Sequence, residues 1–328
     1  LNWKDCYEKA AYYAGIIMGR NPDVSYGTYR LLSFDELWKK SGFDESEHMF
    51  SVRTRSADEE YGNGVHQWYC GMQDAGGVLQ KGPWVGNRFH WYCLFDNEDY
   101  RITKGVKHRF QYDSQVKNGR GYYYPGTPEY KLMATGKNMD DVKVQEPVAP
   151  FNDGLTYTNS ISSNCLAFTT KYADVTDPTI GRTDAYWPFL RYADIVLIYA
   201  EAQCELNDGI SQDAIDALND IRIRSNAKEA SVTGDGAIET KVELRSVIFE
   251  ERAKELAYEG DRRWDLLRWG IYLDVMNSLG GINEDGTRTP YDEGSINKRR
   301  EFRHLLYPLP SLEVSTNMAI DKNNPGWN

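Results

Sequence analysis

Apolar residues recur at helical spacing near the start of the chain. From Trp3 to Ile17 they follow one another at intervals of three or four, which predicts an amphipathic helix. Asn21-Pro22 should end that helix, because proline lacks the backbone N–H and clashes with the preceding helical turn. A short second helix is expected over residues 34–40, so that residues 1–41 form a first helical segment.

A longer helical pattern covers residues 186–279. Its four apolar stripes run from Leu190 to Cys204, from Ala214 to Ile221, from Phe249 to Leu256 and from Trp264 to Leu279. Turn residues separate them at 207–209 and at Gly260, and Ser211 is a candidate N-cap. Stripes joined by short turns predict two antiparallel helical hairpins, residues 189–226 and 240–279. Such pairs suggest a tetratricopeptide-like scaffold, although they do not repeat at that motif's strict period.

The stretch between these parts, residues 42–185, has a different pattern. Gly, Pro, Asn and Asp are frequent and long amphipathic periods are missing, which predicts loops, turns and short strands. Residues 61–130 contain 15 aromatic residues, whereas residues 201–260 contain two. We therefore expect an aromatic, loop-rich ligand-binding module supported by the helices. Residues 280–328 should form a mostly extended tail, because Pro308 and Pro310 exclude long helices there.

Net charge narrows the classes of partner. The chain has 328 residues and a formal charge of −11, which argues against a nucleic-acid binder and against electrostatic attachment to anionic lipid. No uncharged stretch approaches the length of a membrane-spanning helix. Because the chain opens at Leu1 within a helical pattern, we expect it to be a piece of a longer protein.

The acidic cluster Glu250, Glu251, Glu255 and Glu259 raises the question of catalysis. A general acid needs a neutral carboxyl group, and neighbouring cations favour the charged form instead. Since Arg252, Lys254, Arg262 and Arg263 lie close by in sequence, we expect a structural ion-pair network that joins the two helices. The chain should not be an enzyme; a glycoside hydrolase would need two carboxylates about 5–9 Å apart across a cleft, and we nominate no such pair.

Metal and cofactor sites have weak support. The five histidines form no zinc motif, and no phosphate-binding loop occurs. We expect no cofactor. A structural calcium ion is a weaker alternative, with oxygen ligands from Asp174, Asp177 and Asp184 or from residues 283–285, although neither group follows an EF-hand loop.

The aromatic segment is the main candidate for binding. A flat ring offers a large apolar face at little entropic cost, and a sugar has an apolar C–H face with a rim of hydroxyls. The candidate ligand-binding residues lie in loop-like sequence rich in Gly, Asn and Asp: Trp68, Tyr69, Trp84, Asn87, Trp91 and Tyr92. Gln73 and Asp74 are further polar companions. More than half of the rings in this segment should pack in the core.

Four motifs in the second half of the chain resemble a known family. They are residues 190–203 (LRYADIVLIYAEAQ), 217–224 (ALNDIRIR), 249–270 (with FEERAKELAYEG and RRWDLLRWG) and the tail (YPLP at 307–310 and NPG at 324–326). Their order and spacing are similar to those of SusD/RagB-type outer-membrane nutrient-binding lipoproteins. The resemblance implies a mainly α fold, with tetratricopeptide-like helical hairpins and a large loop-rich insertion that carries short strands.

The resemblance also implies a function. Such proteins bind oligosaccharide, or less often peptide, at the cell surface and deliver it to a TonB-dependent transporter of the SusC type. They are held on the extracellular face of the outer membrane by a lipid anchor, which here would lie outside the chain. The alternatives are peptide binding of the RagB kind and a tetratricopeptide-type scaffold for protein–protein contact. Ligand-facing rings within residues 61–130 favour the glycan binder, whereas a scaffold would bind through its helices.

Overall fold

The computed structural model describes residues 2–278 and 300–327, apart from residues 23, 25–27, 45, 57–60, 75, 87–90, 92–93, 97, 108, 112–119, 124–131, 135–141, 145–155 and 160–167. The chain divides into two compact units, which we call unit 1 (residues 1–131 and 144–260) and unit 2 (residues 132–143 and 261–328).

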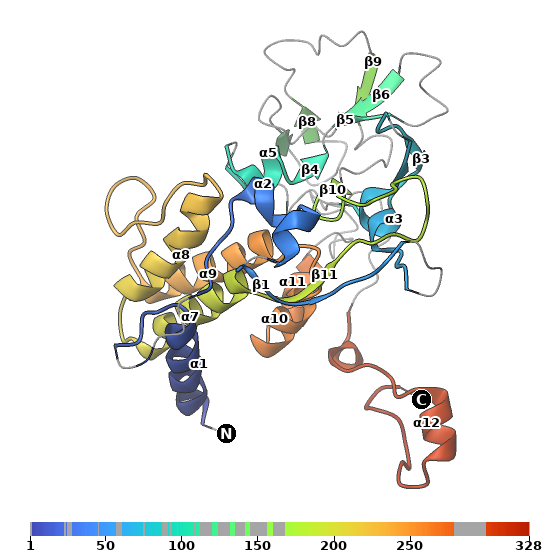
Figure 1. Ribbon diagram of the computed structural model, residues 1–328. Helices are drawn as coiled ribbons and strands as arrows, with labels where there is room; N and C mark the ends of the chain where they lie inside the picture. The colour runs from blue at the N-terminus through green and yellow to red at the C-terminus, as the bar shows by residue number, and fades with distance from the viewer. Residues whose placement is uncertain are drawn as a thin grey trace. The chain divides into compact units, whose positions relative to one another are not determined.

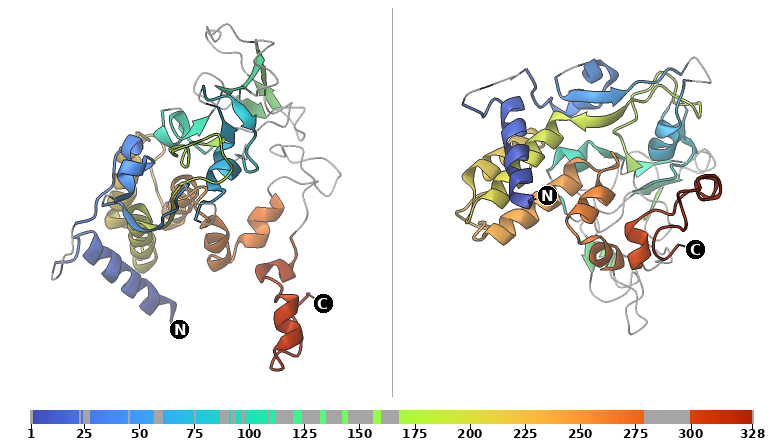
Figure 2. Two further views of the ribbon diagram at one scale, coloured as in Figure 1. Left: turned by 45° about the vertical axis from the view of Figure 1, so that its right-hand side comes forward. Right: turned by 90° about the horizontal axis from the view of Figure 1, so that it is seen from below.

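The longest helices of unit 1 come from the two ends of its sequence, and shorter helices lie between them (Figure 1). They are α1 (Trp3–Ile17), α2 (Phe34–Leu37), the 3-10 helix η1 (Lys40–Asp44), α3 (Val65–Cys70), α5 (Tyr100–Thr103), α7 (Tyr192–Leu206), α8 (Gln212–Arg224) and α9 (Lys241–Glu255). Figures 1 and 2 show α1, α7, α8 and α9 side by side. The predicted first helix is therefore confirmed, and so is the predicted hairpin of residues 189–226, except that the hairpin begins at Tyr192 because residues 187–191 form a strand.

Helix α7 is the centre of the core because it is apolar on nearly all sides. It packs against α1, α8 and α9, and most of its side chains from Tyr192 to Cys204 are buried. Leu197 meets Leu218 of α8 and Leu244 of α9 in one hydrophobic cluster, where all three are fully buried. The apolar stripes identified in the sequence thus mark the real core of the helical part.

Side-chain caps fix where two of these helices begin. The Ser211 hydroxyl accepts a hydrogen bond from the Ala214 N–H, which confirms the predicted N-cap of α8. At α9, Thr240 accepts from the Glu243 N–H while the Glu243 carboxylate accepts from the Thr240 N–H. This reciprocal pair satisfies two backbone donors that a helix start otherwise leaves unpaired.

The segment between the helical ends carries short strands, as predicted. They are β1 (His48–Val52), β2 (Met72–Gln73), β3 (Leu79–Lys81), β4 (Val106–Lys107), β5 (Arg109–Phe110), β6 (Arg120–Tyr123), β7 (Leu132–Ala134), β8 (Val142–Val144), β9 (Thr156–Asn159), β10 (Phe168–Thr169) and β11 (Trp187–Arg191). β1 pairs with β11, β2 with β3, β4 with β10 and β7 with β8, while β6 lies between antiparallel β5 and parallel β9.

The β1–β11 ribbon joins distant parts of the sequence. Val52 pairs with Trp187 and His48 with Arg191, immediately before α7 begins. The ribbon therefore ties the start of the loop-rich segment to the central helix. Its register shifts twice along β1, between His48 and Phe50 and between Phe50 and Ser51.

The described helices of unit 2 are short. They are α10 (Arg262–Arg268), α11 (Tyr272–Ser278), the 3-10 helix η3 (Phe302–Leu305) and α12 (Ser311–Thr316). The sequence predicted one helix over residues 264–279, and that prediction is wrong. Gly270 has a φ of +74°, a left-handed conformation that ends α10 and separates it from α11.

Unit 2 is held together by stacked cationic and aromatic groups. The Arg263 guanidinium lies 4.8 Å from the ring centre of Tyr272 and 4.4 Å from that of Tyr307, and it donates to the His304 carbonyl oxygen. Trp327 donates from its indole nitrogen to the Arg303 carbonyl oxygen. These contacts fix the described tail residues despite their small share of regular structure.

The structure confirms a mainly α fold with short strands in the insertion. Among the described helices, none combines the length and the apolar character that a membrane span requires.

Candidate functional site

Helix α3 places Trp68 and Tyr69 in different surroundings. The Asn63 side-chain oxygen accepts the Val65 N–H at the start of the helix and so fixes its first turn. Val65, His66 and Cys70 are buried, so this side of α3 faces the core. Trp68 points away from the core and is 43% exposed. A six-residue helix thus carries one indole to the surface.

Trp84 joins Trp68 from the turn that follows β3. The Trp68 carbonyl oxygen accepts two hydrogen bonds, from the Trp84 N–H at 2.9 Å and from the Val85 N–H at 3.0 Å. The two indole rings lie 6.4 Å apart between centroids, with 25° between their planes. Trp84 is 73% exposed. The structure therefore brings together two of the predicted binding residues as a surface platform, which we call the indole pair.

Tyr69, the next residue along α3, lies in an aromatic cluster. Its ring is half-buried against Tyr172, Trp187 and Tyr258, at centroid distances of 5.4, 6.1 and 5.6 Å. Burial raises the pKa of its hydroxyl. Tyr69 therefore contributes packing between α3 and the neighbouring segments, and its surroundings differ from those of the indole pair.

Trp91 also packs against the scaffold. Its indole N–H donates to the Ala253 carbonyl oxygen at 2.8 Å, and its ring meets Phe95 and Tyr258 edge-on. These contacts fasten the loop-rich segment to α9. Asn87 and Tyr92 lie outside the described residues, so their part in binding stays a prediction.

The polar side chains beside β2 and β3 are engaged locally. The Asp74 carboxylate accepts the Gly76 and Val78 N–H groups and so closes the β2–β3 turn. Gln73 donates from its side-chain amide to the Cys70 carbonyl oxygen. The Asp74 contacts stabilise the hairpin that precedes Trp84, and the Gln73 contact ties β2 to the end of α3.

A second exposed aromatic pair was not predicted. Phe50 of β1 and Phe189 of β11 are 62% and 59% exposed, with ring centroids 5.7 Å apart. Both strands are too short to show a period of two clearly, and their pairing spans more than a hundred residues of sequence. The signal available in the sequence was therefore too weak to identify this pair.

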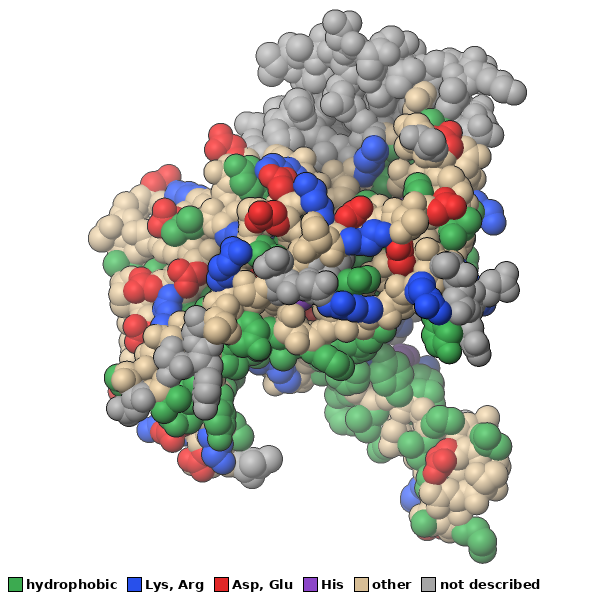
Figure 3. Space-filling model, in the orientation of Figure 1, with side chains coloured by type: hydrophobic (Ala, Val, Ile, Leu, Met, Phe, Trp, Pro, Cys, Tyr) green, Lys and Arg blue, Asp and Glu red, His purple; other side chains and the backbone are tan. Residues whose placement is uncertain are grey.

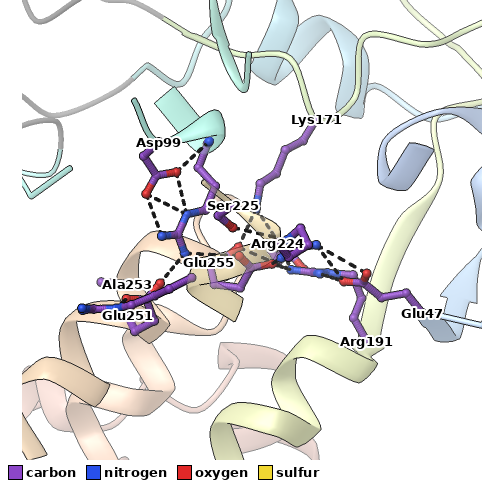
Figure 4. A network of polar contacts seen from close by, with 12 residues as sticks. Glu47, Asp99, Lys171, Arg191, Arg224, Ser225, Glu251, Ala253 and Glu255 are labelled. Atoms are coloured by element: carbon purple, nitrogen blue, oxygen red, sulfur yellow. Dashed lines mark hydrogen bonds and ion pairs between the residues drawn. The ribbon is translucent and has the colours of Figure 1, made fainter. Parts of the chain in front are cut away.

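Three of the four glutamates of the acidic cluster that follows Phe249 take part in a buried ion network (Figure 4). We call Glu251, Glu255 and Glu259 the acidic row. Arg101 and Arg222 bind Glu251, Arg191 and Arg224 bind Glu255, and Arg191 and Lys171 bind Glu259. Glu47 and Asp99 complete the network through Arg191 and Arg101. The expected network is confirmed, but its partners were not those predicted.

The cations nearest in sequence bind elsewhere. Arg252 pairs with Asp194 of α7, and Lys254 pairs with Glu250 on the solvent side of α9. Arg263 stacks within unit 2. The acidic row is instead neutralised by residues from β11, α8, α5 and the segment after β10.

The network keeps the acidic row ionised. Burial opposes the charged form of Glu255, but the guanidinium groups of Arg224, Arg191 and Arg101 outweigh it and hold its pKa well below the ordinary value. The pKa of Glu251 and that of Glu259 are lowered in the same way by their own cations. Carboxylates held ionised in this way do not suit general-acid catalysis.

The predicted calcium ligands are occupied by other partners. The Lys40 ammonium lies 2.7 Å from Asp184, and the Lys40 N–H donates to Asp174. The Asp177 carboxylate accepts from the Thr179 N–H and hydroxyl. Among the described residues, no group of three or more His, Cys, Asp or Glu side chains converges in a way that could hold a metal ion. Residues 283–285 lie outside the described part.

On the face shown in Figure 3, acidic and basic side chains are interspersed over the described residues. That face differs from the continuous basic face by which proteins neutralise nucleic-acid phosphates.

Comparison with known proteins identifies the family. The SusD family matches residues 73–327. SusD-like protein P2 of Formosa agariphila is 33% identical over 142 residues, which are 42% of this chain and 25% of that protein. A SusD homologue of Bacteroides thetaiotaomicron superposes with a TM-score of 0.62 at 20% identity, over 99% of this chain and 60% of the other. Surface glycan-binding protein A of the same organism, in complex with laminarihexaose, gives 0.61 at 18% identity, over 98% and 60%.

The chain thus spans about three-fifths of the length of these solved relatives. The family match itself extends from β2 to the tail and includes the helical hairpin, the acidic row and the final NPG sequence. The chain belongs to the SusD family.

Proposed function

We propose that this chain takes part in capturing a glycan at the cell surface, and that the indole pair is its contact surface. The observation that carries the proposal is the pair itself: two exposed indoles fixed to each other by backbone hydrogen bonds. The similarity to a surface glycan-binding protein solved with laminarihexaose supports the same class of ligand. The pair also lies within residues 61–130, where a glycan binder and not a helical scaffold would place its rings.

The physical fit rests on the chemistry of sugars. The C–H face of a pyranose packs on an indole, while its hydroxyls stay at the rim and in water. Because those hydroxyls are well solvated, a single site binds weakly, and a preorganised platform limits the further loss of conformational freedom. The proposed function is capture without chemistry, consistent with the ionised acidic row.

Two further parts of the proposal, the transporter partner and the membrane anchor, come from what the resemblance to SusD/RagB-type proteins implies. The captured glycan would pass to a partner TonB-dependent transporter of the SusC type. A lipid anchor outside this chain would hold the protein on the extracellular face of the outer membrane. Contact with the transporter and the anchor both concern the whole protein, of which this chain matches a part.

A protein-binding scaffold is the second candidate function, with a peptide as its ligand or another protein as its partner. It is favoured by the exposed aromatic residues of α1: Trp3, Tyr12 and Tyr13 are 61%, 50% and 62% exposed. A scaffold of this kind would bind through its helices, far in sequence from the indole pair.

Affinity gel electrophoresis tests the proposal. The chain is run through gels that contain laminarin or other plant, host and microbial polysaccharides. Trp84→Ala should weaken retardation by about tenfold, since a lost stacking contact of about 1.4 kcal/mol corresponds to that factor. Trp3→Ala is the matched control, because Trp3 is similarly exposed but lies on α1.

The outcomes separate the two functions. Retardation lost in Trp84→Ala and kept in Trp3→Ala supports glycan capture at the indole pair. Retardation unchanged in Trp84→Ala removes the pair from the site. If no polysaccharide retards the chain, capture of glycan is refuted for this chain, and peptide binding through the helices becomes the better explanation.

A further inference from the structure

The two indoles of the pair are not equivalent. Trp84 is 73% exposed and Trp68 is 43% exposed. The difference arises because Trp68 has Gly64 against it: a Cβ at Gly64 would lie 2.8 Å from Cε2 of Trp68 and 3.0 Å from its Cζ2 and Nε1. Trp68 is therefore confined between a glycine backbone and the second ring, whereas Trp84 keeps most of its surface free for a ligand.

Backbone hydrogen bonds couple the positions of the two rings. The Trp68 N–H donates to the Gly64 carbonyl oxygen, and the Trp68 carbonyl oxygen accepts from Trp84 and Val85. On the other side of the turn, Pro83 packs at Gly71, where an added Cβ would lie 3.2 Å from the proline Cδ. A shift of α3 at Gly64 or Trp68 would consequently move the Trp84 turn as well.

We infer that Trp84 makes the primary ligand contact and that Trp68 and Gly64 are positioning residues, which set the angle at which the Trp84 ring is presented. The inference rests on the proposed glycan-binding function and assigns the roles within that site. A platform whose angle is set before the ligand arrives binds more tightly than one that must be ordered on binding.

Gly64 allows a clean test, because its backbone does not require glycine. Its φ is −89° and its ψ is 6°, a conformation with negative φ that is also open to alanine. Gly64→Ala therefore acts through its contact with the Trp68 ring, which must shift. Gly209→Ala is the matched control, since a Cβ at Gly209 meets nothing within 4 Å.

The experiment combines circular dichroism with affinity electrophoresis in laminarin gels. Two stacked indoles couple their transitions, so the exciton signal of the pair reports the ring geometry. We expect Gly64→Ala to change this signal and to weaken binding by about threefold to tenfold, a cost of up to about 1.4 kcal/mol. Thermal stability should stay close to that of the parent chain. Gly209→Ala should change neither the signal nor the affinity.

Trp68→Ala and Trp84→Ala complete the design. Both abolish the exciton signal, and Trp84→Ala should weaken binding more than Trp68→Ala. The inference is overturned if Trp68→Ala costs more affinity than Trp84→Ala, or if Gly64→Ala alters the signal without altering affinity. In each of these results the polysaccharide still retards the parent chain. Glycan binding by the chain would then stand, and only the roles assigned to Trp68, Trp84 and Gly64 would be overturned. A parent chain that no polysaccharide retards overturns the proposed function and this inference with it.

Discussion

Replacing Arg191 by methionine tests whether the buried ion network stabilises the fold. Arg191 is 1% exposed and joins three carboxylates: its guanidinium nitrogens lie 2.6 Å from Glu47, 3.1 Å from Glu255 and 2.6 Å from Glu259. Methionine fills a similar volume but leaves these carboxylates without their shared cation. The fully buried Glu47 would keep Arg224 alone, at 3.4 Å.

The magnitude follows from the cost of an uncompensated buried charge. Removing one partner of a buried ion pair destabilises a protein by about 3–5 kcal/mol. The whole free energy of unfolding of a domain is only about 5–15 kcal/mol. Arg191→Met should therefore remove about a fifth or more of the stability of unit 1 and lower its Tm by on the order of 10 °C.

Lys104→Met is the matched control, because its ion pair has the same length and a different environment. The Lys104 ammonium lies 2.6 Å from Asp35, but the two side chains are 37% and 61% exposed. An exposed pair contributes about 1 kcal/mol at most. The two variants therefore compare pairs of equal distance and unequal burial.

Urea unfolding followed by circular dichroism measures both variants. The expected difference in unfolding free energy between them is at least about 2 kcal/mol. Equal losses would contradict the reasoning, since burial would then not matter to the pair. If Arg191→Met does not fold, Glu255→Gln offers a milder test, because it removes one charge and keeps the shape of the side chain.

Further predictions concern pH, caps and turns. The carboxylates of the acidic row have lowered pKa values in the folded state. Their contribution to the free energy of unfolding is therefore fully present above the unfolded pKa of about 4.3, and it is lost progressively as the pH falls from there through the lower folded-state values. Burial raises the pKa of Glu47, which offsets part of this effect, but a Tm series should still fall steeply below about pH 4. Thr240→Ala removes the capping box of α9 and should cost about 1 kcal/mol in urea unfolding, whereas unchanged stability would show that the cap is dispensable. Gly270→Ala places a Cβ in a left-handed conformation and should cost about 1 kcal/mol in the same assay; no loss would mean that the turn relaxes.

The helical part of the fold was predictable because its information is local. The stripe from Ala193 to Cys204 lies within one helix and the Ser211 cap within a single turn, and both match the structure, although Leu190 at the start of the predicted stripe belongs to β11. The break at Gly270 was missed because the apolar period continues through it, and a glycine within a helical pattern does not by itself end a helix.

The candidate site was only partly predictable because its geometry is not local. Trp68 and Tyr69 are adjacent in sequence, and a six-residue helix is too short to show which of them faces the core. The pairing of Trp68 with Trp84 depends on closure of the β2–β3 turn. Likewise, the partners of the acidic row could not be read from the sequence near α9, because Arg101 lies 150 residues before Glu251.

These long separations have a consequence for how the chain reaches its fold. Glu47 meets Arg191 across 144 residues and Lys171 meets Glu259 across 88. A half-assembled network would bury charges without partners, so intermediates that contain only some of these segments are penalised. The N-terminal and C-terminal segments of unit 1 must therefore assemble in the same step. This favours a cooperative folding transition with a slow, late step. During synthesis, a nascent chain that has not yet emerged as far as Glu259 cannot complete the network. The helices of unit 1 therefore cannot pack stably until the last residues of the unit have been made.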